Sequence, residues 1–222
     1  MRMEMSNKMK MKIDNGREYR DMQMSPVENQ DMIVEGYATT FDEPYFLYQL
    51  DENTFVYEQI LGSALDDADM SDVIMQYDHE GRVYARMSNN TLALIPDDHG
   101  LKIRGDLGGT RIGQDLYQEI KGGYTTKMSW GFSIVPNSDT VELMREEDDK
   151  QYYLRTITKV RKIYDVSAVS LPANNFTEIS ARKALDGEIK LLESERLARK
   201  IEEKRKQKKI NALRELIEEM RG

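Results

Sequence analysis

The middle of the chain is built from short runs of hydrophobic and β-branched residues, the pattern that is typical of β-strands. Residues 32–41 are rich in β-branched and aromatic side chains and end at a turn over residues 42–44. Residues 54–60 have the same strand character. Residues 73–77 form an apolar run of the length of a buried strand, and the sequence Asp78-His79-Glu80-Gly81 follows it. A histidine at the end of a core strand is well placed to face a cleft.

A hairpin and a helix follow these strands. The strand-like residues 91–95 and 101–107 flank the turn sequence PDDHG, which predicts a β-hairpin with His99 in its turn. Residues 110–121 carry apolar side chains at helical spacing, with Thr110 suited to cap the N-terminus and two glycines at the end. The sequence therefore predicts one helix directly before the next strand.

That next strand, predicted over residues 125–135, contains the segment KMSWGFSI and the only tryptophan of the chain. Its Ser129 is a candidate nucleophile. A serine in a strand is usually just a small packing residue, so a chemical role for Ser129 depends on partners elsewhere in the chain.

One or two further strands are predicted over residues 151–171, after a polar excursion over residues 136–147. Side chains alternate between the two faces of a strand, so Asp165 lies on a face that is otherwise apolar or small. The expected faces are Tyr164, Val166, Ala168 and Ser170 on one side, and Asp165, Ser167, Val169 and Leu171 on the other.

The C-terminal part of the chain, from about residue 177, has helix-forming residues and no proline. Two groups of apolar residues lie at helical spacing, and a strongly charged run over residues 202–209 separates them. The pattern predicts a long exposed helix, or a helix pair, that docks on a partner. The two apolar groups are Leu185, Ile189 and Leu192, and Ile210, Leu213, Ile217 and Met220.

Composition narrows the classes of function. The 222 residues include no cysteine and two histidines, which excludes disulfides and thiolate catalysis and argues against a cysteine- or histidine-based metal site. No apolar run approaches the ~20 residues of a membrane span, and no signal peptide is evident, so a soluble intracellular protein is expected.

The net charge of −8 is unevenly distributed along the chain. Residues 182–222 carry 13 Lys and Arg against 9 Asp and Glu, a net charge of +4, so residues 1–181 have a net charge of −12. An acidic body argues against nucleic acid as the main ligand.

Three candidate catalytic groups stand on or beside separate predicted strands: His79, Ser129 and Asp165. A hydroxyl is a poor nucleophile near neutral pH, and it needs an adjacent base such as an imidazole to take its proton. The imidazole in turn needs a partner that fixes its tautomer, which a carboxylate does well. The spacing of the three residues does not by itself establish a triad, because many proteins contain all three types.

The motifs around these groups add a resemblance to a known family. They are Gly36-Tyr37-Ala38, Tyr77-Asp78-His79-Glu80, Asp98-His99-Gly100-Leu101, Met128-Ser129-Trp130-Gly131-Phe132, and Asp165-Val166-Ser167 with Leu171-Pro172-Ala173-Asn174. In this order the motifs resemble the prohead protease family of tailed bacteriophages, capsid maturation serine proteases that are related in fold to the herpesvirus assemblins. The resemblance covers about residues 31–180.

The resemblance implies His79 as the base and Ser129 as the nucleophile. In the family the residue before Val-Ser is commonly Glu, whereas this chain has Asp165, one methylene shorter. Assemblins use a second histidine instead, and His99 is the other histidine of this chain. We prefer Asp165 as the third member, because His99 lies in a turn beside two aspartates. Backbone N–H groups are the expected oxyanion donors, with Arg155 and Arg161 as alternatives.

The fold that the resemblance implies is mainly β with peripheral helices: a closed antiparallel β-barrel of assemblin or prohead-protease type, plus a long C-terminal helical tail. Residues 31–171 supply seven or eight predicted strands, enough to close a barrel. The chain lacks a Gly-x-Ser-x-Gly elbow around Ser129 and so does not read as an α/β-hydrolase. We expect a weakly ordered leader over residues 1–30, the protease domain over residues 31–181 and a charged helical tail over residues 182–222.

The implied function is that of a serine endopeptidase that cleaves scaffold, and itself, inside the assembling prohead in the host cytoplasm. Its expected partners are the scaffolding protein and the major capsid protein, with self-association left open, and it needs no cofactor, metal or membrane. Two alternatives remain at this stage. One is a catalytically inert assembly factor of the same fold that acts through the C-terminal helix, and the other is a nucleic-acid-binding module that acts through the basic tail.

Overall fold

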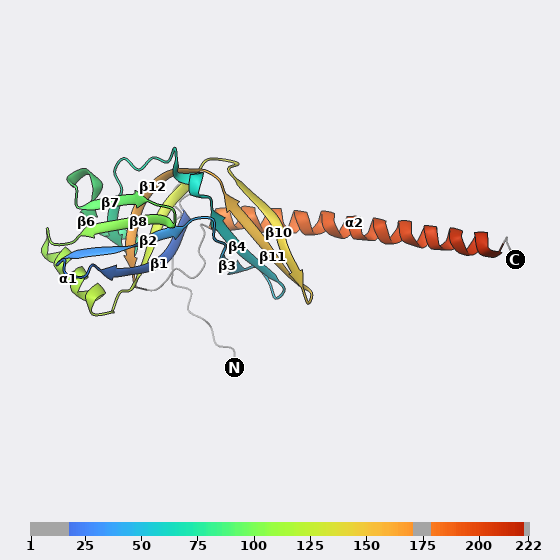
Figure 1. Cartoon of the computed structure of the whole chain (residues 1–222), viewed down its shortest axis with the longest axis horizontal. Coiled ribbons are helices and arrows are strands. Elements are labelled where there is room, and N and C mark those ends of the chain that lie inside the picture. The colour runs from blue at the N-terminus through green and yellow to red at the C-terminus, as the bar shows by residue number, and fades with distance from the viewer. Residues whose placement is uncertain (1–17, 171–178, 220–222) are drawn as a thin grey trace. The chain divides into compact units, whose positions relative to one another are not determined.

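The computed structural model describes residues 18–170 and 179–219, and these residues form twelve strands, two α-helices and two short 3₁₀ helices (Figure 1). The chain divides into two compact units, one ending at Arg182 and the other beginning at Lys183. All strands and the first α-helix belong to the first unit, and the second unit consists of helix.

Eight strands form the main sheet. They are β1 (Glu18–Pro26), β2 (Ile33–Thr40), β5 (Ile74–Tyr77), β6 (Glu80–Arg86), β7 (Leu92–Pro96), β8 (Gly100–Asp106), β9 (Lys127–Ile134) and β12 (Val160–Val169). In the order β6-β5-β12-β9-β1-β2-β8-β7 they curl into a nearly closed barrel, which confirms the predicted fold class. Neighbouring strands are antiparallel except for β5 and β12, which run parallel.

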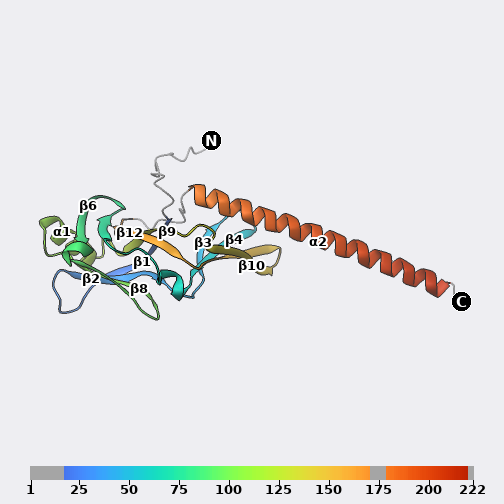
Figure 2. The same ribbon diagram turned by 90° about the horizontal axis from the view of Figure 1, so that it is seen from above.

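A second sheet has four strands in the order β10-β11-β4-β3, and Figures 1 and 2 both show it beside the barrel. Its strands are β3 (Tyr45–Gln49), β4 (Thr54–Ile60), β10 (Asp139–Glu147) and β11 (Lys150–Ile157). Most of the predicted polar excursion over residues 136–147 is therefore strand β10. As an edge strand that pairs with β11 alone, β10 has polar and exposed positions on both faces, which hides the strand pattern in the sequence.

Strand β1 lies in the middle of the main sheet, between β9 and β2, although its residues fall within the segment expected to be a leader. Strand pairing thus begins before residue 31. The contact between β1 and β2 is unusually close at Gly36, where a Cβ atom would lie 2.4 Å from the carbonyl oxygen of Gln23. Only glycine allows this approach, so Gly36 is needed to hold β1 in place.

Two α-helices accompany the sheets. Helix α1 (Arg111–Lys121) begins as predicted, with the hydroxyl of Thr110 accepting a hydrogen bond of 3.1 Å from the N–H of Gly113. Helix α2 (Ile179–Glu219) is one continuous helix, in agreement with the long tail helix that the sequence predicts. None of the described helices is long and apolar enough to cross a membrane. The two 3₁₀ helices are Gly62–Leu65 and Met87–Asn89.

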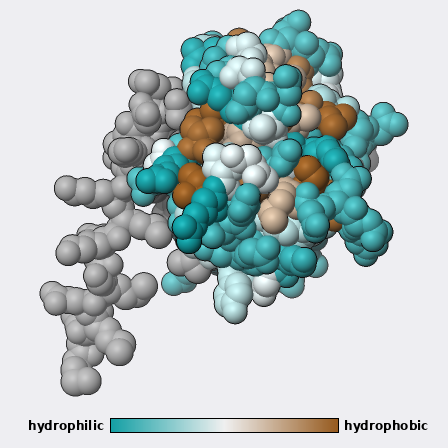
Figure 3. Space-filling view, turned by 90° about the vertical axis from the view of Figure 1, so that its left-hand side faces the viewer, coloured by the Kyte–Doolittle hydropathy of each residue, from teal (hydrophilic) through white to brown (hydrophobic). Residues whose placement is uncertain are grey.

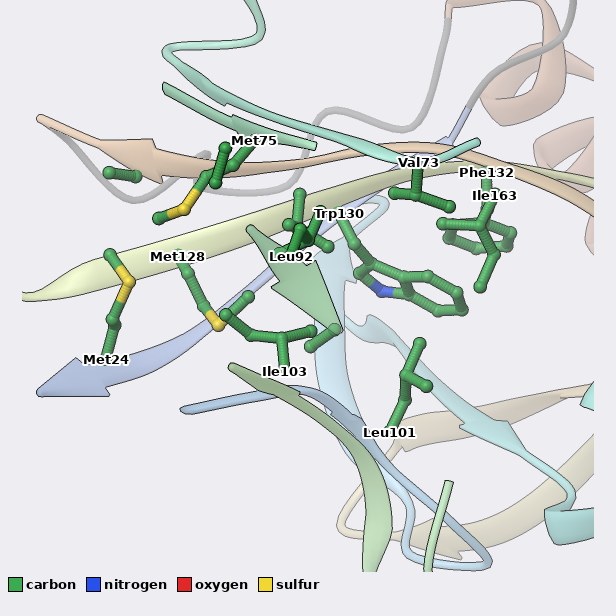
Figure 4. Close-up of a cluster of buried hydrophobic side chains, with 14 of the residues drawn as sticks. Met24, Val73, Met75, Leu92, Leu101, Ile103, Met128, Trp130, Phe132 and Ile163 are labelled. Atoms are coloured by element: carbon green, nitrogen blue, oxygen red, sulfur yellow. The ribbon is translucent and has the colours of Figure 1, made fainter. Parts of the chain in front are cut away.

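The core of the barrel gathers on one face of β9. Met128, Trp130 and Phe132 are fully buried there, and the rings of Trp130 and Phe132 stack with centroids 4.1 Å apart. Figure 4 shows these side chains among hydrophobic residues from other strands of the barrel, including Met24, Met75, Leu101, Ile103 and Ile163. Because side chains alternate along a strand, the same packing turns Ser129 to the opposite face of β9.

Candidate active site

His79 stands in the two-residue turn that joins β5 to β6. Tyr77 pairs with Glu80 across this turn, and the φ angles of Asp78 and His79 are 49° and 59°. Left-handed backbone at two successive non-glycine residues is the geometry of a type I′ hairpin turn, and it costs about 1 kcal/mol or more per residue. The turn is therefore held by contacts outside itself.

Those contacts come from Asp78 and reach the end of β12. The carboxylate of Asp78 accepts hydrogen bonds from the backbone N–H of Ser170 at 2.9 Å and from its hydroxyl at 2.8 Å. The backbone N–H of Asp78 donates to the carbonyl oxygen of Ala168 at 2.9 Å. Three hydrogen bonds thus fasten the turn to β12 and fix where the side chain of His79 starts.

The side chain of His79 meets Asp165 of β12. Its Nδ1 lies 2.5 Å from Oδ1 of Asp165, and the two side chains are 16% and 2% exposed. A carboxylate only accepts hydrogen bonds, so Nδ1 carries the proton and donates it toward Asp165. In the neutral ring this leaves the lone pair on Nε2, the form of a histidine that can act as a base.

Ser167 supports the same carboxylate. Its hydroxyl, which is fully buried, donates a hydrogen bond of 2.9 Å to the Oδ1 atom that faces His79. Asp165 and Ser167 therefore share one face of β12, as the alternation of the sequence predicts, even though the register with β9 shifts between Ile163 and Asp165. The role of Ser167 in holding Asp165 was not predicted, although the two-residue spacing was a signal for it.

Ser129 lies directly opposite Ser167 in the β9–β12 ladder, so its side chain is on the face that carries Asp165. Ser129 is fully buried, and its Oγ makes no hydrogen bond with any residue that the structure describes. Leaving a buried hydroxyl unsatisfied costs about 1–3 kcal/mol, so its presence here needs another explanation. Catalytic hydrogen bonds are often long in resting enzymes, and a nucleophile that awaits its substrate fits this state.

His99, the alternative third member, has other partners. Its backbone N–H donates to Asp97 at 2.9 Å, and its ring meets Tyr37 of β2 edge-on with centroids 4.6 Å apart. The hydroxyl of Tyr37 donates to the second oxygen of Asp97 at 2.8 Å, and this hydrogen bond is the main cause that lowers the pKa of Asp97. These contacts tie the β7–β8 turn to β2 and give His99 a structural role.

The two arginines that were considered as oxyanion donors also have other partners. Arg155 lies on β11 in the second sheet, where it is buried and paired with Glu58 at 2.9 Å and Asp139 at 2.7 Å. Arg161 donates from Nε to the hydroxyl of Ser133 at 3.2 Å. Ser133 is four residues along β9 from Ser129, about 13 Å in an extended strand. Neither guanidinium group is held at Ser129, which leaves backbone N–H groups as the expected donors.

No group of three or more histidine, aspartate and glutamate side chains among the described residues is arranged to hold a metal ion.

Comparison with known proteins identifies a family but no individual relative. The family model described as caudovirus prohead serine protease matches residues 20–190, which is most of the chain and includes His79, Ser129 and Asp165. No curated protein and no solved structure matches the chain.

The hydrogen bond between His79 and Asp165 predicts a distinct proton NMR signal. A buried Nδ1–H that donates to a carboxylate exchanges slowly with water and resonates far downfield of the backbone amides. We expect one such signal in the wild type, its loss in His79→Gln and Asp165→Asn, and its retention in the matched control His99→Gln. A signal that persists in Asp165→Asn, or that is lost in His99→Gln alone, would contradict the assignment.

Proposed function

The chain belongs to the caudovirus prohead serine protease family, and on this premise we propose that it is a serine endopeptidase that cleaves scaffold, and itself, inside the immature capsid. The site of action is the assembling prohead in the host cytoplasm. The observation that carries the proposal is the 2.5 Å contact between His79 and Asp165 on the face of the sheet where the buried Ser129 hydroxyl has no partner among the described residues.

The proposed reaction is acyl transfer. The Oγ atom of Ser129 attacks the carbonyl carbon of the scissile peptide bond while Nε2 of His79 takes the hydroxyl proton. The tetrahedral intermediate collapses as His79 gives this proton to the leaving nitrogen, which breaks the C–N bond and releases the amine product. Water then attacks the acyl-enzyme, again losing its proton to His79, and the proton returns to Ser129 as the acid product leaves.

Asp165 acts through His79 in this proposal. The carboxylate holds the ring in the tautomer that has the lone pair on Nε2, and it stabilises the imidazolium that forms during each half-reaction. Ser167 and Asp78 are positioning residues, because Ser167 holds the carboxylate and Asp78 holds the turn from which His79 projects. The shorter Asp in place of the family's common Glu is compatible with this geometry, since the turn brings His79 within hydrogen-bond distance.

The tail offers a physical basis for access to the capsid interior. Helix α2 exposes large apolar side chains along a surface that is otherwise strongly charged: Leu191, Leu197, Ile201, Ile210 and Leu213 are each at least 43% exposed. Apolar side chains repeating along an exposed helix are suited to pack against other helices. We propose that α2 assembles with helices of the scaffold and so carries the protease into the shell beside the major capsid protein.

Co-expression with the scaffold tests the proposed activity. We expect the wild type to cleave the scaffold and Ser129→Ala to leave it intact, because removing the nucleophile of a serine protease lowers its rate by roughly 10³-fold or more. His99→Ala should cleave as the wild type does. Intact scaffold with the wild type would contradict the proposal and favour the inert assembly factor, and equal cleavage by Ser129→Ala would show that another residue is the nucleophile.

Deletion of residues 191–222 tests the proposed role of the tail. We expect the shortened protein to keep peptidase activity in solution and to be lost from proheads, because the deletion begins after the end of the family match at residue 190 and removes the exposed apolar side chains of α2. If the exposed apolar side chains of α2 contact the scaffold, Leu213→Asn should reduce packaging of the protease into proheads, whereas the neighbouring control Arg214→Asn should not. Packaging at the wild-type level after the deletion would overturn this role.

A further inference from the structure

Strand β12 contains two residues, Arg161 and Tyr164, that have no partner on β9, because the register of this ladder shifts at each of them. Each is the extra residue of a β-bulge, and a bulge changes the direction of a side chain relative to the regular alternation of a strand. The bulge at Tyr164 directly precedes Asp165, the proposed partner of His79. The irregular part of β12 thus borders the proposed active site.

Both of these extra side chains reach Ser133 of β9. The Nε atom of Arg161 donates a hydrogen bond of 3.2 Å to the hydroxyl of Ser133, and the hydroxyls of Tyr164 and Ser133 lie 3.2 Å apart. The Nη2 atom of Arg161 also donates to the Tyr164 hydroxyl, at 3.4 Å. Ser133 is 2% exposed, whereas Arg161 is exposed. Two hydroxyls therefore hold an exposed guanidinium group in a defined orientation.

Ser133 connects this cluster to the proposed nucleophile. Ser129 and Ser133 are four residues apart on β9, so both lie on the face opposite to the buried rings of Trp130 and Phe132. Four residues of an extended strand span about 13 Å, which is too far for Arg161 to act on the reacting carbonyl. A substrate that lies extended along β9 would instead place a side chain about three to five residues from the scissile bond at Arg161.

The charge of Arg161 is not balanced by a carboxylate within residues 18–170 and 179–219. The next residue differs in this respect. The Nζ atom of Lys162 lies 2.6 Å from Oδ2 of Asp69, and this hydrogen bond is the main cause that lowers the pKa of Asp69. A guanidinium group held by neutral hydroxyls keeps further N–H groups for an anion, and a carboxylate matches its planar geometry.

We propose that Arg161 binds a glutamate or aspartate side chain of the substrate polypeptide, about three to five residues from the bond that Ser129 attacks, an inference that rests on the proposed function. The acidic side chain would accept hydrogen bonds from the guanidinium group while Ser133 and Tyr164 keep that group in place. A lysine or arginine side chain at the same position would be repelled, so the contact discriminates against basic residues as well.

The surface at one end of the first unit agrees with recognition through individual contacts. Figure 3 views the molecule from the side on which Figure 1 shows α1 and β6, and most of the described residues on that face are hydrophilic. Hydrophobic residues form small, separate patches there, so the described residues of this face present no broad apolar surface on which a folded scaffold could dock. This favours selection of the cleaved bond through an extended segment of the substrate.

Cleavage of scaffold variants by the full-length protein tests the inference. Mass spectrometry first maps the bond that the wild type cuts, and scaffold variants then carry Glu or Gln at single positions roughly two to six residues from this bond on either side. At one of these positions we expect the wild type to cut the Glu form about fivefold faster than the Gln form, as for an exposed charge pair. This ratio should fall as salt is added, because salt screens exposed charges.

Substitution of Arg161 identifies the group responsible. In Arg161→Gln the ratio should fall to about one, because the neutral side chain has no charge to pair with the acid, and Arg161→Glu should favour Lys over Glu at the same position. Each ratio compares two substrates of one variant, so a smaller amount of folded protein does not change it. The matched control is Arg111→Gln, which removes an exposed positive charge from the start of α1 and should keep the wild-type ratio.

Two results would overturn the inference and leave the proposed function standing. One is a wild type that has no preference for Glu at any of these positions, and the other is a preference that Arg161→Gln retains. Scaffold that stays intact with the wild type would overturn the proposed function, and the inference with it.

Discussion

The pairing of β9 with β12 is the constraint on which the rest of the site depends. On one face of β9, Met128, Trp130 and Phe132 are fully buried in the barrel core. Their packing determines which face of β9 points into the core. Because side chains alternate along a strand, Ser129 must lie on the other face of β9, where it neighbours its ladder partner Ser167. A shift of one residue in this register would move Trp130 out of the core face and Ser129 into it. The register that packs the core is therefore also the register that places the Ser129 hydroxyl.

A second constraint brings the imidazole to that face. The parallel pairing of β5 with β12 ends at the tight turn of Asp78 and His79, and Asp78 bonds back to Ser170 just beyond the end of β12. From there the ring of His79 reaches Asp165, whose carboxylate is also held by Ser167. Asp165, Ser167 and the anchor at Ser170 come from one stretch of chain, so β12 sets the relative positions of the base and its carboxylate, and the barrel adds the nucleophile from β9.

Much of this arrangement could be predicted from the sequence, and the exceptions have physical reasons. The strand of Ser129, the helix capped by Thr110 and the hairpin of His99 follow from local patterns of burial and turn chemistry. Strand β1 was missed because its residues are mostly polar, and its place in the sheet depends on the glycine at position 36 of another strand. Strand β10 was missed because it is an edge strand. The sequence already favoured Asp165 over His99, but the contact of Asp165 with His79 joins residues that are 86 positions apart and depends on the pairing of β5 with β12.

The assignment of Ser129 as the nucleophile is the central claim, and covalent labelling tests it most directly. After reaction with a fluorophosphonate, intact-mass and peptide-mapping measurements should find one phosphonyl group on Ser129. The label should be absent in Ser129→Ala, strongly slowed in His79→Gln and Asp165→Asn, and unchanged in His99→Gln. A label on a different residue, or a rate in His79→Gln equal to that of the wild type, would contradict the account.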